Sequence, residues 1–531
     1  MKSEYGILDL FAGPGGLGEG FAGYKTSDGS RPFRIQLSAE YEPNAWRTLR
    51  LRAFARQFEN SRPPGYSAIR STNELPDWAS SHPREWERAG EEAQQLKLGE
   101  PEAAVAVDNA IKAAKAQHGD RTIVIGGPPC QAYSLVGRSR NAGKKDYTLA
   151  NDEKTFLFRE YVRVLKKLRP AVFIMENVSG LLSAKLDSEP VFDLIRNELT
   201  RMDGRRDYEL VALDPRPTNL CGKFGPADFL VKAEAHGVPQ ARHRLLLVGL
   251  RMDVAAELRS KEGVSLPRIT RLPEISAGAM LDSLPRLRSG LSMREQDDDE
   301  WHKVMRTVMS NVCRALPKRS NKQKPVAEKA RELRDLHRES GLLERSSRSL
   351  NIRMSAKVPK ALRTFIERPD MRHLFGHETR SHMQEDLERY FFAAVHALVN
   401  QRSPVASEFP AELAPAHANW NSGSFADRFR VQVHDKPSST ITSHISKDGH
   451  FFIHPDALQC RSLTVREAAR MQTFPDDYLF LGPRTAQYVQ VGNAVPPYLA
   501  RQVAAALYEA LSTSCANKGT TKKPTAKNET I

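Results

Sequence analysis

One cysteine stands where a thiol could act as a nucleophile. Cys130 follows two glycines and two prolines in "IGGPPCQAYS", directly after an apolar run. Proline fixes φ and has no N–H donor, so Pro128 and Pro129 favour an extended chain that leaves the sheet here. A thiol reacts well only as thiolate, which requires partial exposure and nearby positive charge. The polar, basic stretch after Cys130 is typical of a loop that closes on an anion. The alternative is an inert, buried cysteine.

A carboxylate and two arginines could act beside that thiol. Glu176 and Asn177 follow the apolar run "AVFIM". Apolar surroundings favour the protonated form of a carboxylic acid, so Glu176 could donate a proton, or it could be a structural residue bound by backbone amides. Arg242 and Arg244 in "QARHR" face one side of an extended chain. They could pair with Glu176, stabilise a thiolate or hydrogen-bond a carbonyl oxygen.

A glycine-rich stretch near the N-terminus is typical of a nucleotide-binding turn. "DLFAGPGGLGEGF" carries Gly13, Gly15 and Gly18 in the G-x-G-x-x-G spacing, and Glu40 follows 22 residues after Gly18. Glycines let the backbone approach a ligand closely, and a carboxylate at this distance can accept ribose hydroxyls. A nicotinamide or flavin nucleotide, an adenosine-containing methyl donor and a turn without ligand remain open. No Lys or Arg lies in the loop and Glu19 would repel a phosphate, which favours an uncharged nucleoside edge.

The elements that must position these residues alternate between strands and helices over the first 250 residues. The apolar runs "YGILDLF", "FRIQLSAE", "TIVIGG" and "AVFIM" each deliver polar residues at a carboxyl end, where open α/β sheets bind ligands. In "RHRLLLVGL" the polar residues instead lead into the strand. Residues 52–120 are rich in Pro, Glu, Arg and Ala and are interpreted as an insertion, with a helix near Ala103 to Ala116.

The second half of the chain has a different character. Basic helical segments over 252–435 predict a second domain, with helices in "DDDEWHKVMRTVMSNVCRAL" and "HMQEDLERYFFAAVHALV". Thr464 with Glu467 three residues later forms a capping-box pattern, and "PPYLARQVAAALYEAL" predicts a closing helix with prolines in its first turn. Residues 512–531 have little to bury and are expected to be disordered.

Composition bounds the class of protein. The 531 residues carry a formal charge of +15, and residues 301–380 hold 20 Lys or Arg against 8 Asp or Glu. This concentration suits a surface that meets phosphates, although a solvated basic face is the simpler reading. Five scattered cysteines without a CxxC pair argue against a disulfide framework and a metal site. Without a signal peptide or membrane-spanning run, we expect a cytoplasmic protein.

Six motifs in order resemble the DNA cytosine-5 methyltransferases, of the bacterial restriction-modification type. They are "DLFAGPGG", "GGPPCQAYS", "ENV", "QARHR", "RSLTVREAARMQTFP" and "QVGNAVPP", covering most of residues 5–250 and 425–510. The resemblance implies a doubly wound, mixed α/β sheet of the Rossmann-like type over 1–251. It also implies a smaller target-recognition domain over 252–435 and a return segment over 436–511 that completes the first domain. Double-stranded DNA would lie between the domains.

The resemblance also implies roles for the catalytic residues. Cys130 would attack C6 of an extruded cytosine, so that C5 accepts a methyl group from S-adenosyl-L-methionine. Glu176 would engage N3 and the exocyclic amino group, and Arg244 would hold O2. Arg242 and Asn177 would support the site. The "REAARMQTFP" helix would organise the recognition domain rather than take part in chemistry.

Ten positions match the family's cofactor contacts. These are Phe11, Gly13, Gly15 and Gly16 around the methionine, Glu40 on the ribose, Tyr41 against the adenine, and Pro129, Leu157, Asn493 and Ala494. The acidic residue that usually contacts the adenine amino group has no clear match, and Asp120 is a weak candidate. The family implies no metal.

Several questions stay open at the level of sequence. A tRNA cytosine-5 methyltransferase shares this chemistry, but the RNA branch has a short recognition segment. A nucleotide-dependent oxidoreductase would explain only the glycine loop, and a catalytically silent DNA-binding relative would have lost Cys130 or Glu176. We expect a nucleoid-associated monomer. A cognate restriction endonuclease encoded nearby, phage defence and gene regulation are alternative contexts, and the target sequence is not derivable.

Overall fold

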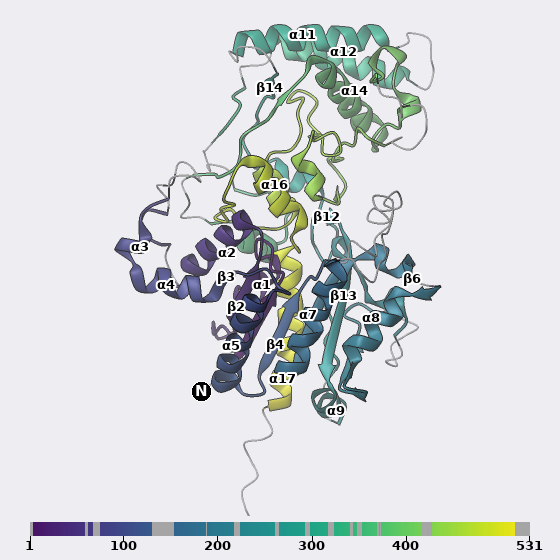
Figure 1. The fold of residues 1–531 in the computed structure, drawn as a ribbon. Coiled ribbons are helices and arrows are strands. Elements are labelled where there is room, and N and C mark those ends of the chain that lie inside the picture. Colours follow the sequence, from purple (N-terminus) through teal and green to yellow (C-terminus); the bar gives the residue numbers. More distant parts are fainter. Residues whose placement is uncertain are drawn as a thin grey trace, which may run out of the picture.

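The computed structural model describes most of the chain. The described residues are 4–58, 62–66, 69, 75–129, 153–186, 188–216, 224–260, 265–292, 298–316, 323–339, 343–347, 353–368, 371, 373–416, 420 and 427–515. Cys130 lies outside them, as do residues 516–531, which make up most of the predicted disordered tail. Figure 1 shows a lower lobe built on a sheet and an upper lobe of helices, with α16 (Arg484–Asn493) between them.

A mixed sheet of eight strands forms the lower lobe, in the order β10-β13-β5-β4-β1-β2-β3, with β11 also paired to β13. The strands are β1 (Tyr5–Leu10), β2 (Phe33–Glu40), β3 (Ala93–Gln95), β4 (Thr122–Gly126), β5 (Val172–Val178), β10 (Tyr208–Val211), β11 (Leu230–Lys232) and β13 (His243–Arg251). β3, β2, β1, β4 and β5 are mutually parallel, and β13 runs antiparallel to β5. The predicted doubly wound, mixed α/β fold is confirmed.

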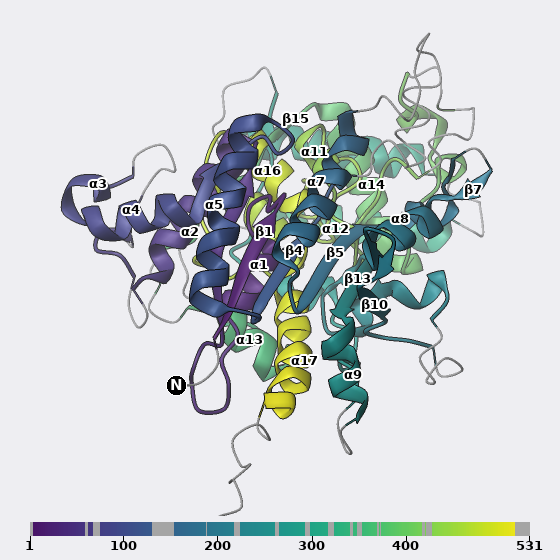
Figure 2. The ribbon, with the colours of Figure 1, turned by 60° about the horizontal axis from the view of Figure 1, so that its bottom comes forward.

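Helices cover both faces of the sheet, which explains why the central strands are apolar throughout. One face packs against α5 (Pro101–His118), α7 (Glu153–Leu168) and α8 (Val191–Thr200), through a core that includes Leu8 and Val124. The other packs against α1 (Gly16–Ala22), α9 (Met252–Ser260) and α17 (Pro497–Cys515), through Ile7 and Ile123. Figure 2 shows α5 and α7 on one side of the strands and α17 on the other.

The segment predicted as an insertion divides into two parts. Residues 93–118 belong to the regular alternation, because they form β3, which pairs in parallel with β2, and α5. The true excursion consists of α3 (Trp78–Ser81) and α4 (Pro83–Glu92). α4 packs on α2 (Pro43–Arg56), and α3 packs on α4. The insertion is therefore shorter than predicted. β3 was not predicted because it has only three residues, of which Ala93 is the only apolar one.

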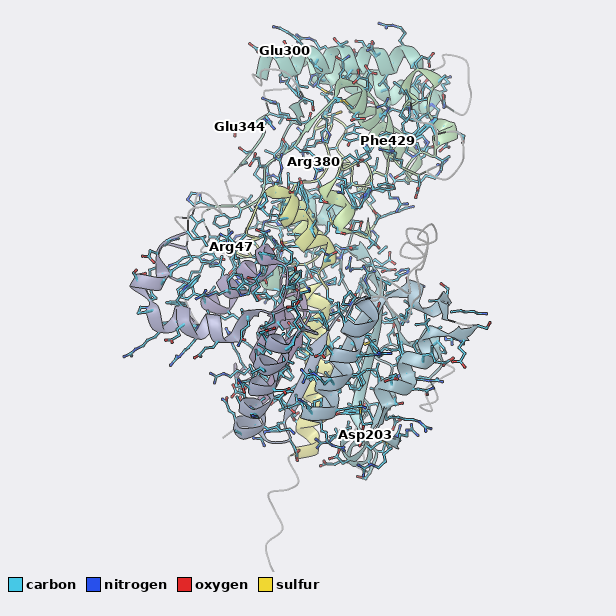
Figure 3. The ribbon with its side chains drawn as sticks, in the orientation of Figure 1. Arg47, Asp203, Glu300, Glu344, Arg380 and Phe429 are labelled. Carbon is cyan, nitrogen blue, oxygen red and sulfur yellow. The ribbon has the colours of Figure 1, made fainter. Side chains whose placement is uncertain are left out.

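The upper lobe has its own core, formed by α11 (Asp298–Ala315), α12 (Lys324–Glu339) and α14 (Gln384–Asn400). This core includes residues as late as Cys460, whereas α10 (Ala277–Leu281) and α13 (Lys360–Ile366) pack with residues 441–498 instead. The core of the upper lobe therefore extends past residue 435, and some residues after 252 pack with the return segment. The cores thus do not follow the predicted boundaries at 252 and 435. In Figure 3, Glu300 lies at the far end of the upper lobe, Asp203 at the opposite end of the lower lobe and Arg380 near their junction.

The junction is built around α15 (Val465–Met471), which begins with the predicted capping box between Thr464 and Glu467. Arg461 donates to both oxygens of Glu467 at 2.7 Å, and Arg470 pairs with Asp476 at 2.8 Å. All these side chains are buried. Buried charges are tolerated only when they are paired, so these ion pairs hold the segments around α15 together.

Candidate active site

A carboxylate and a guanidinium meet where β5 and β13 lie side by side. Antiparallel pairing sets Leu246 opposite Glu176 and Arg244 opposite Val178, which brings the Glu176 and Arg244 side chains together. Arg244 Nε lies 2.9 Å from Glu176 Oε1, and both side chains are about 15% exposed or less. Of the pairings left open by the sequence, the structure therefore shows Arg244 on Glu176. The Glu176 carboxylate thus has a cationic partner in Arg244, whereas the apolar run before Glu176 indicated only apolar surroundings.

The end of β4 lies against the same place. Asn177 Nδ2 donates to the Pro128 carbonyl at 3.4 Å, and Asn177 Oδ1 accepts from Val178 N at 2.8 Å. A Cβ at Gly127 would lie 3.1 Å from Glu176 Oε2, so a larger residue would crowd the carboxylate. Pro129 is the last described residue before Cys130. The chain that leads into Cys130 thus starts beside the Glu176–Arg244 pair.

Arg242, which was expected to support the site, contacts the backbone of the return segment. Its guanidinium is buried and donates to the carbonyls of Ile441 at 2.8 Å and Gly492 at 3.3 Å. Burial, with the charge of Arg244 nearby, lowers the pKa of Arg242 to about 9. Arg242 therefore ties β13 to the return segment, and its described contacts are with backbone rather than with Glu176.

The glycine loop follows β1 at the neighbouring part of the sheet edge. Phe11, Gly13 and Gly15 have φ of 56°, 58° and 96°, a left-handed conformation that favours glycine. Nothing lies within 4 Å of where a Cβ of Gly13 would stand, so the loop borders open space. Glu40 accepts from Gly13 N and Glu42 N, each at 2.8 Å, and burial raises the pKa of its carboxyl.

The return segment closes the back of this loop. A Cβ on Gly16 would lie 2.1 Å from the Val495 carbonyl, so only glycine fits at the start of α1. The hydroxyl of Tyr478 donates to the Pro14 carbonyl. Ala494 is buried beside the loop and Asn493 is exposed at the end of α16. No local sequence pattern indicates this contact of Tyr478, because its partner is 464 residues away.

An exposed aromatic ring borders the same site. Tyr41, which follows β2, is 60% exposed. Gln95, at the end of β3, donates to the Tyr41 carbonyl at 3.2 Å, and Lys97 Nζ lies 5.8 Å from the ring centroid. Leu157 on α7 is partly buried against the same core as Phe11. An exposed ring, a carboxylate and open space beside glycines are what a nucleoside with an uncharged edge requires, so the described residues fit such a cofactor.

Two expectations about charged residues are wrong. Asp120 precedes β4, and its 89% exposed side chain lies 3.4 Å from Arg251. It stands at the amino end of the parallel strands, opposite the glycine loop, and cannot reach an adenine bound there. Glu19 is buried and pairs with Arg52 and Arg56, so it does not face a ligand at the loop.

Comparisons with known proteins identify the family. Residues 105–509 match the model of the C-5 cytosine-specific DNA methylases. The type II methyltransferase M.Bpa9945I of Bacillus paralicheniformis is 30% identical over 527 residues, covering 95% of this chain and 99% of that protein. The DNA (cytosine-5-)-methyltransferase M.ApeKI of Aeropyrum pernix is 26% identical, covering 74% of this chain and 82% of that protein. A putative DNA modification methyltransferase of an Escherichia coli prophage aligns with a TM-score of 0.49 at 17% identity.

The chain belongs to the C-5 cytosine-specific DNA methylase family, as the six motifs predicted. It is a DNA (cytosine-5-)-methyltransferase, and methyltransferases generally take their methyl group from S-adenosylmethionine. Over the described ranges, no helix is long and apolar enough to span a membrane. No group of three or more His, Cys, Asp or Glu among the same residues could hold a metal ion.

Proposed function

We propose that this enzyme methylates C5 of a cytosine within a specific double-stranded DNA sequence, through base flipping and a covalent bond between Cys130 and C6. The observation that carries the proposal is the Glu176–Arg244 pair beside Pro128, where the chain runs toward Cys130. A base held by that pair would present its ring to a thiol on the adjoining segment.

The proposed reaction needs three groups of this chain. The Cys130 thiolate adds to C6, and the electrons of the C5–C6 double bond move to C5, where they form the bond to the methyl group. Glu176 engages N3 and the exocyclic amino group as charge builds on the ring, and Arg244 holds O2. Loss of the C5 proton to a base then restores the double bond and expels the thiolate.

S-Adenosylmethionine, when bound, would supply an electrophilic methyl group on a sulfonium, and the electrons of the broken S–CH3 bond would leave with the neutral thioether S-adenosylhomocysteine. The residues proposed to hold it are Phe11, Gly13, Gly15, Gly16, Glu40, Tyr41, Pro129, Leu157, Asn493 and Ala494. Glu40 would accept the ribose hydroxyls and Tyr41 would stack on the adenine. Gly13 and Gly15 allow the backbone to approach the ligand.

Removing the Tyr478 hydroxyl should weaken cofactor binding. Tyr478→Phe leaves the buried Pro14 carbonyl without its donor, which loosens the loop beneath Gly15. The KM for S-adenosylmethionine should rise about fivefold or more, while kcat changes less than about twofold. Steady-state kinetics at varied cofactor concentration measure both constants.

Tyr488→Phe is a matched control for that variant. Tyr488 is equally buried, and its hydroxyl donates to the Leu463 carbonyl at 2.7 Å, away from the glycine loop. It should leave the KM for the cofactor unchanged. Equal effects of the two substitutions on this KM would mean that Tyr478 acts only on general stability.

Because C6 is inaccessible in a stacked duplex, the target base must leave the helix, at a cost of a few kcal/mol. The basic upper lobe would contact phosphates and base edges and so offset this cost. We further propose that the enzyme is a cytoplasmic, nucleoid-associated monomer. The type II methyltransferases among its relatives favour a restriction-modification role with a cognate endonuclease.

Bisulfite or nanopore sequencing tests the proposed activity. DNA from cells that express the protein should carry 5-methylcytosine at one recurrent sequence, and DNA from cells that express Cys130→Ala should carry none. A duplex with 5-fluorocytosine at that sequence should form a covalent adduct, because fluorine cannot leave C5 as a proton does. Unmodified DNA alongside methylated tRNA would contradict the DNA assignment, and active turnover without an adduct would contradict the mechanism.

A further inference from the structure

A cavity with a volume of about 420 Å³ borders the C-terminal part of α1, whereas the glycine loop precedes this helix. Its described lining comes from α1, α2, α13 and α17, from the segments that follow α1, α2 and α13, and from Asp477 after α15. α13 and α17 are held together there, since the Phe365 and Tyr498 rings lie 5.6 Å apart. Figure 2 shows α13 beside α17. None of the residues proposed for the cofactor or for catalysis lines this cavity.

Four arginines of the lining share two carboxylates. Glu19 pairs with Arg52 and Arg56, and Asp477 pairs with Arg52, Arg62 and Arg368, at 2.5 to 3.7 Å. The four arginine side chains are only 11% to 25% exposed. Glu92 adds one more carboxylate, on Arg56. Among the described residues, these four cations outnumber the three carboxylates that contact them. Cations of like sign that are largely buried repel one another, so the cluster attracts a further anion.

Three more cations line the same cavity. Lys25 is exposed after α1, Arg31 is half-buried before β2, and Arg501 on α17 lies with its guanidinium 5.5 Å from the Phe365 ring centroid. Together with the four arginines they give seven basic residues against two acidic ones among the described residues that line the cavity. These basic residues come from segments far apart in the sequence. The excess of positive charge therefore arises only in the folded chain and not from consecutive basic residues.

The chemistry of the lining selects a class of ligand. Arginine forks match phosphate oxygens in pairs, and most of these cations are arginines. The cavity exceeds the size of a single phosphate and falls within the range of small-molecule sites. Phe58, Tyr66 and Phe365 supply an apolar wall. We propose that this cavity binds phosphate groups, either of a free nucleotide or pyrophosphate, or of the DNA backbone outside the recognition sequence.

Direct binding to the full-length protein tests the proposal without any measurement of methyl transfer. Titration calorimetry at low ionic strength with pyrophosphate and with ADP should show saturable binding, and each ligand should raise the melting temperature. Lys25→Glu/Arg31→Glu should increase the Kd about tenfold or more, because it replaces two cations of the lining with anions. Neither residue takes part in the proposed chemistry.

The control is Lys112→Glu/Lys232→Glu, which changes the net charge equally at two exposed lysines outside the cavity. It should bind pyrophosphate and ADP as wild type does. If the free anions do not bind but the Lys25/Arg31 variant loses affinity for a long duplex more than the control does, the DNA backbone is the source of the phosphates. If neither anion binds and both double variants bind duplex alike, the cavity is not a phosphate site.

Discussion

Replacing Cys130 with alanine should lower the rate of methyl transfer by about 10⁴-fold or more, because in the proposed mechanism its thiolate adds to C6 and makes C5 nucleophilic. Binding of S-adenosylmethionine should change little, since the glycine loop, Glu40 and Tyr41 are untouched. Single-turnover transfer of a tritiated methyl group measures the rate, and equilibrium dialysis measures cofactor binding.

Cys313→Ala is the appropriate control for Cys130→Ala. Cys313 lies in the core of the upper lobe, and burial raises the pKa of its thiol. Its removal should cost some stability but leave the rate of transfer close to that of wild type. Wild-type rates in Cys130→Ala would refute the nucleophile assignment. Glu176→Gln should have a smaller effect than Cys130→Ala, because an amide can still hydrogen-bond the base.

Glu467→Ala should destabilise the folded protein by about 3–5 kcal/mol. The substitution leaves the buried Arg461 guanidinium without the carboxylate that it contacts twice, and an unpaired buried charge is strongly destabilising. It also removes the capping box of α15, which begins at Thr464. Urea unfolding measures the loss as a lower midpoint at an unchanged slope.

The matched control is Glu328→Ala, which removes a surface carboxylate that lies 3.9 Å from Lys324. Its side chain is 59% exposed, so the change in unfolding free energy should stay within about 0.5 kcal/mol. Similar losses in the two variants would show that the Arg461–Glu467 pair does not stabilise the junction.

The contribution of Glu467 should also depend on pH. Arg461 lowers the pKa of the Glu467 carboxyl despite burial, which opposes ionisation. A carboxyl with a depressed pKa in the folded state stabilises the protein above its unfolded pKa, near 4.5, and loses that contribution as the pH falls toward the folded pKa. The stability difference between wild type and Glu467→Ala should therefore be constant above about pH 5 and shrink below about pH 4.

Local sequence patterns predicted the elements whose signals lie within a few residues. β1, β2, β4 and β13 lie where apolar runs predicted them, α15 starts at the predicted cap, and α11, α14 and α17 match the predicted helical segments. β5 continues through Glu176 and Asn177, which were expected just beyond its end. The polar "AQQ" of β3 carries no strand signal, so its place in the sheet follows only from pairing with β2.

The contacts that position the site could not be predicted in this way. Arg242 was expected to support the site, but its hydrogen-bond partners lie 199 and 250 residues away, and no local pattern indicates them. Glu19 on α1 and Arg52 on α2 likewise form their ion pair only in the folded chain. The order of the motifs identified the family because each motif shows which residue types stand at individual positions. The hydrogen-bond and ion-pair partners of those residues depend on tertiary packing, which the motifs do not show.

Because α17 packs on α1, the sheet domain cannot complete its fold until the end of the chain has been synthesised. The first helix of the chain completes its core only when residues after Pro497 have left the ribosome. At about 5–20 residues per second, synthesis of some 500 residues takes roughly 25–100 s. During that interval the glycine loop lacks the Val495 carbonyl and the Tyr478 hydroxyl behind it, so a nascent chain does not yet hold this loop in its final shape.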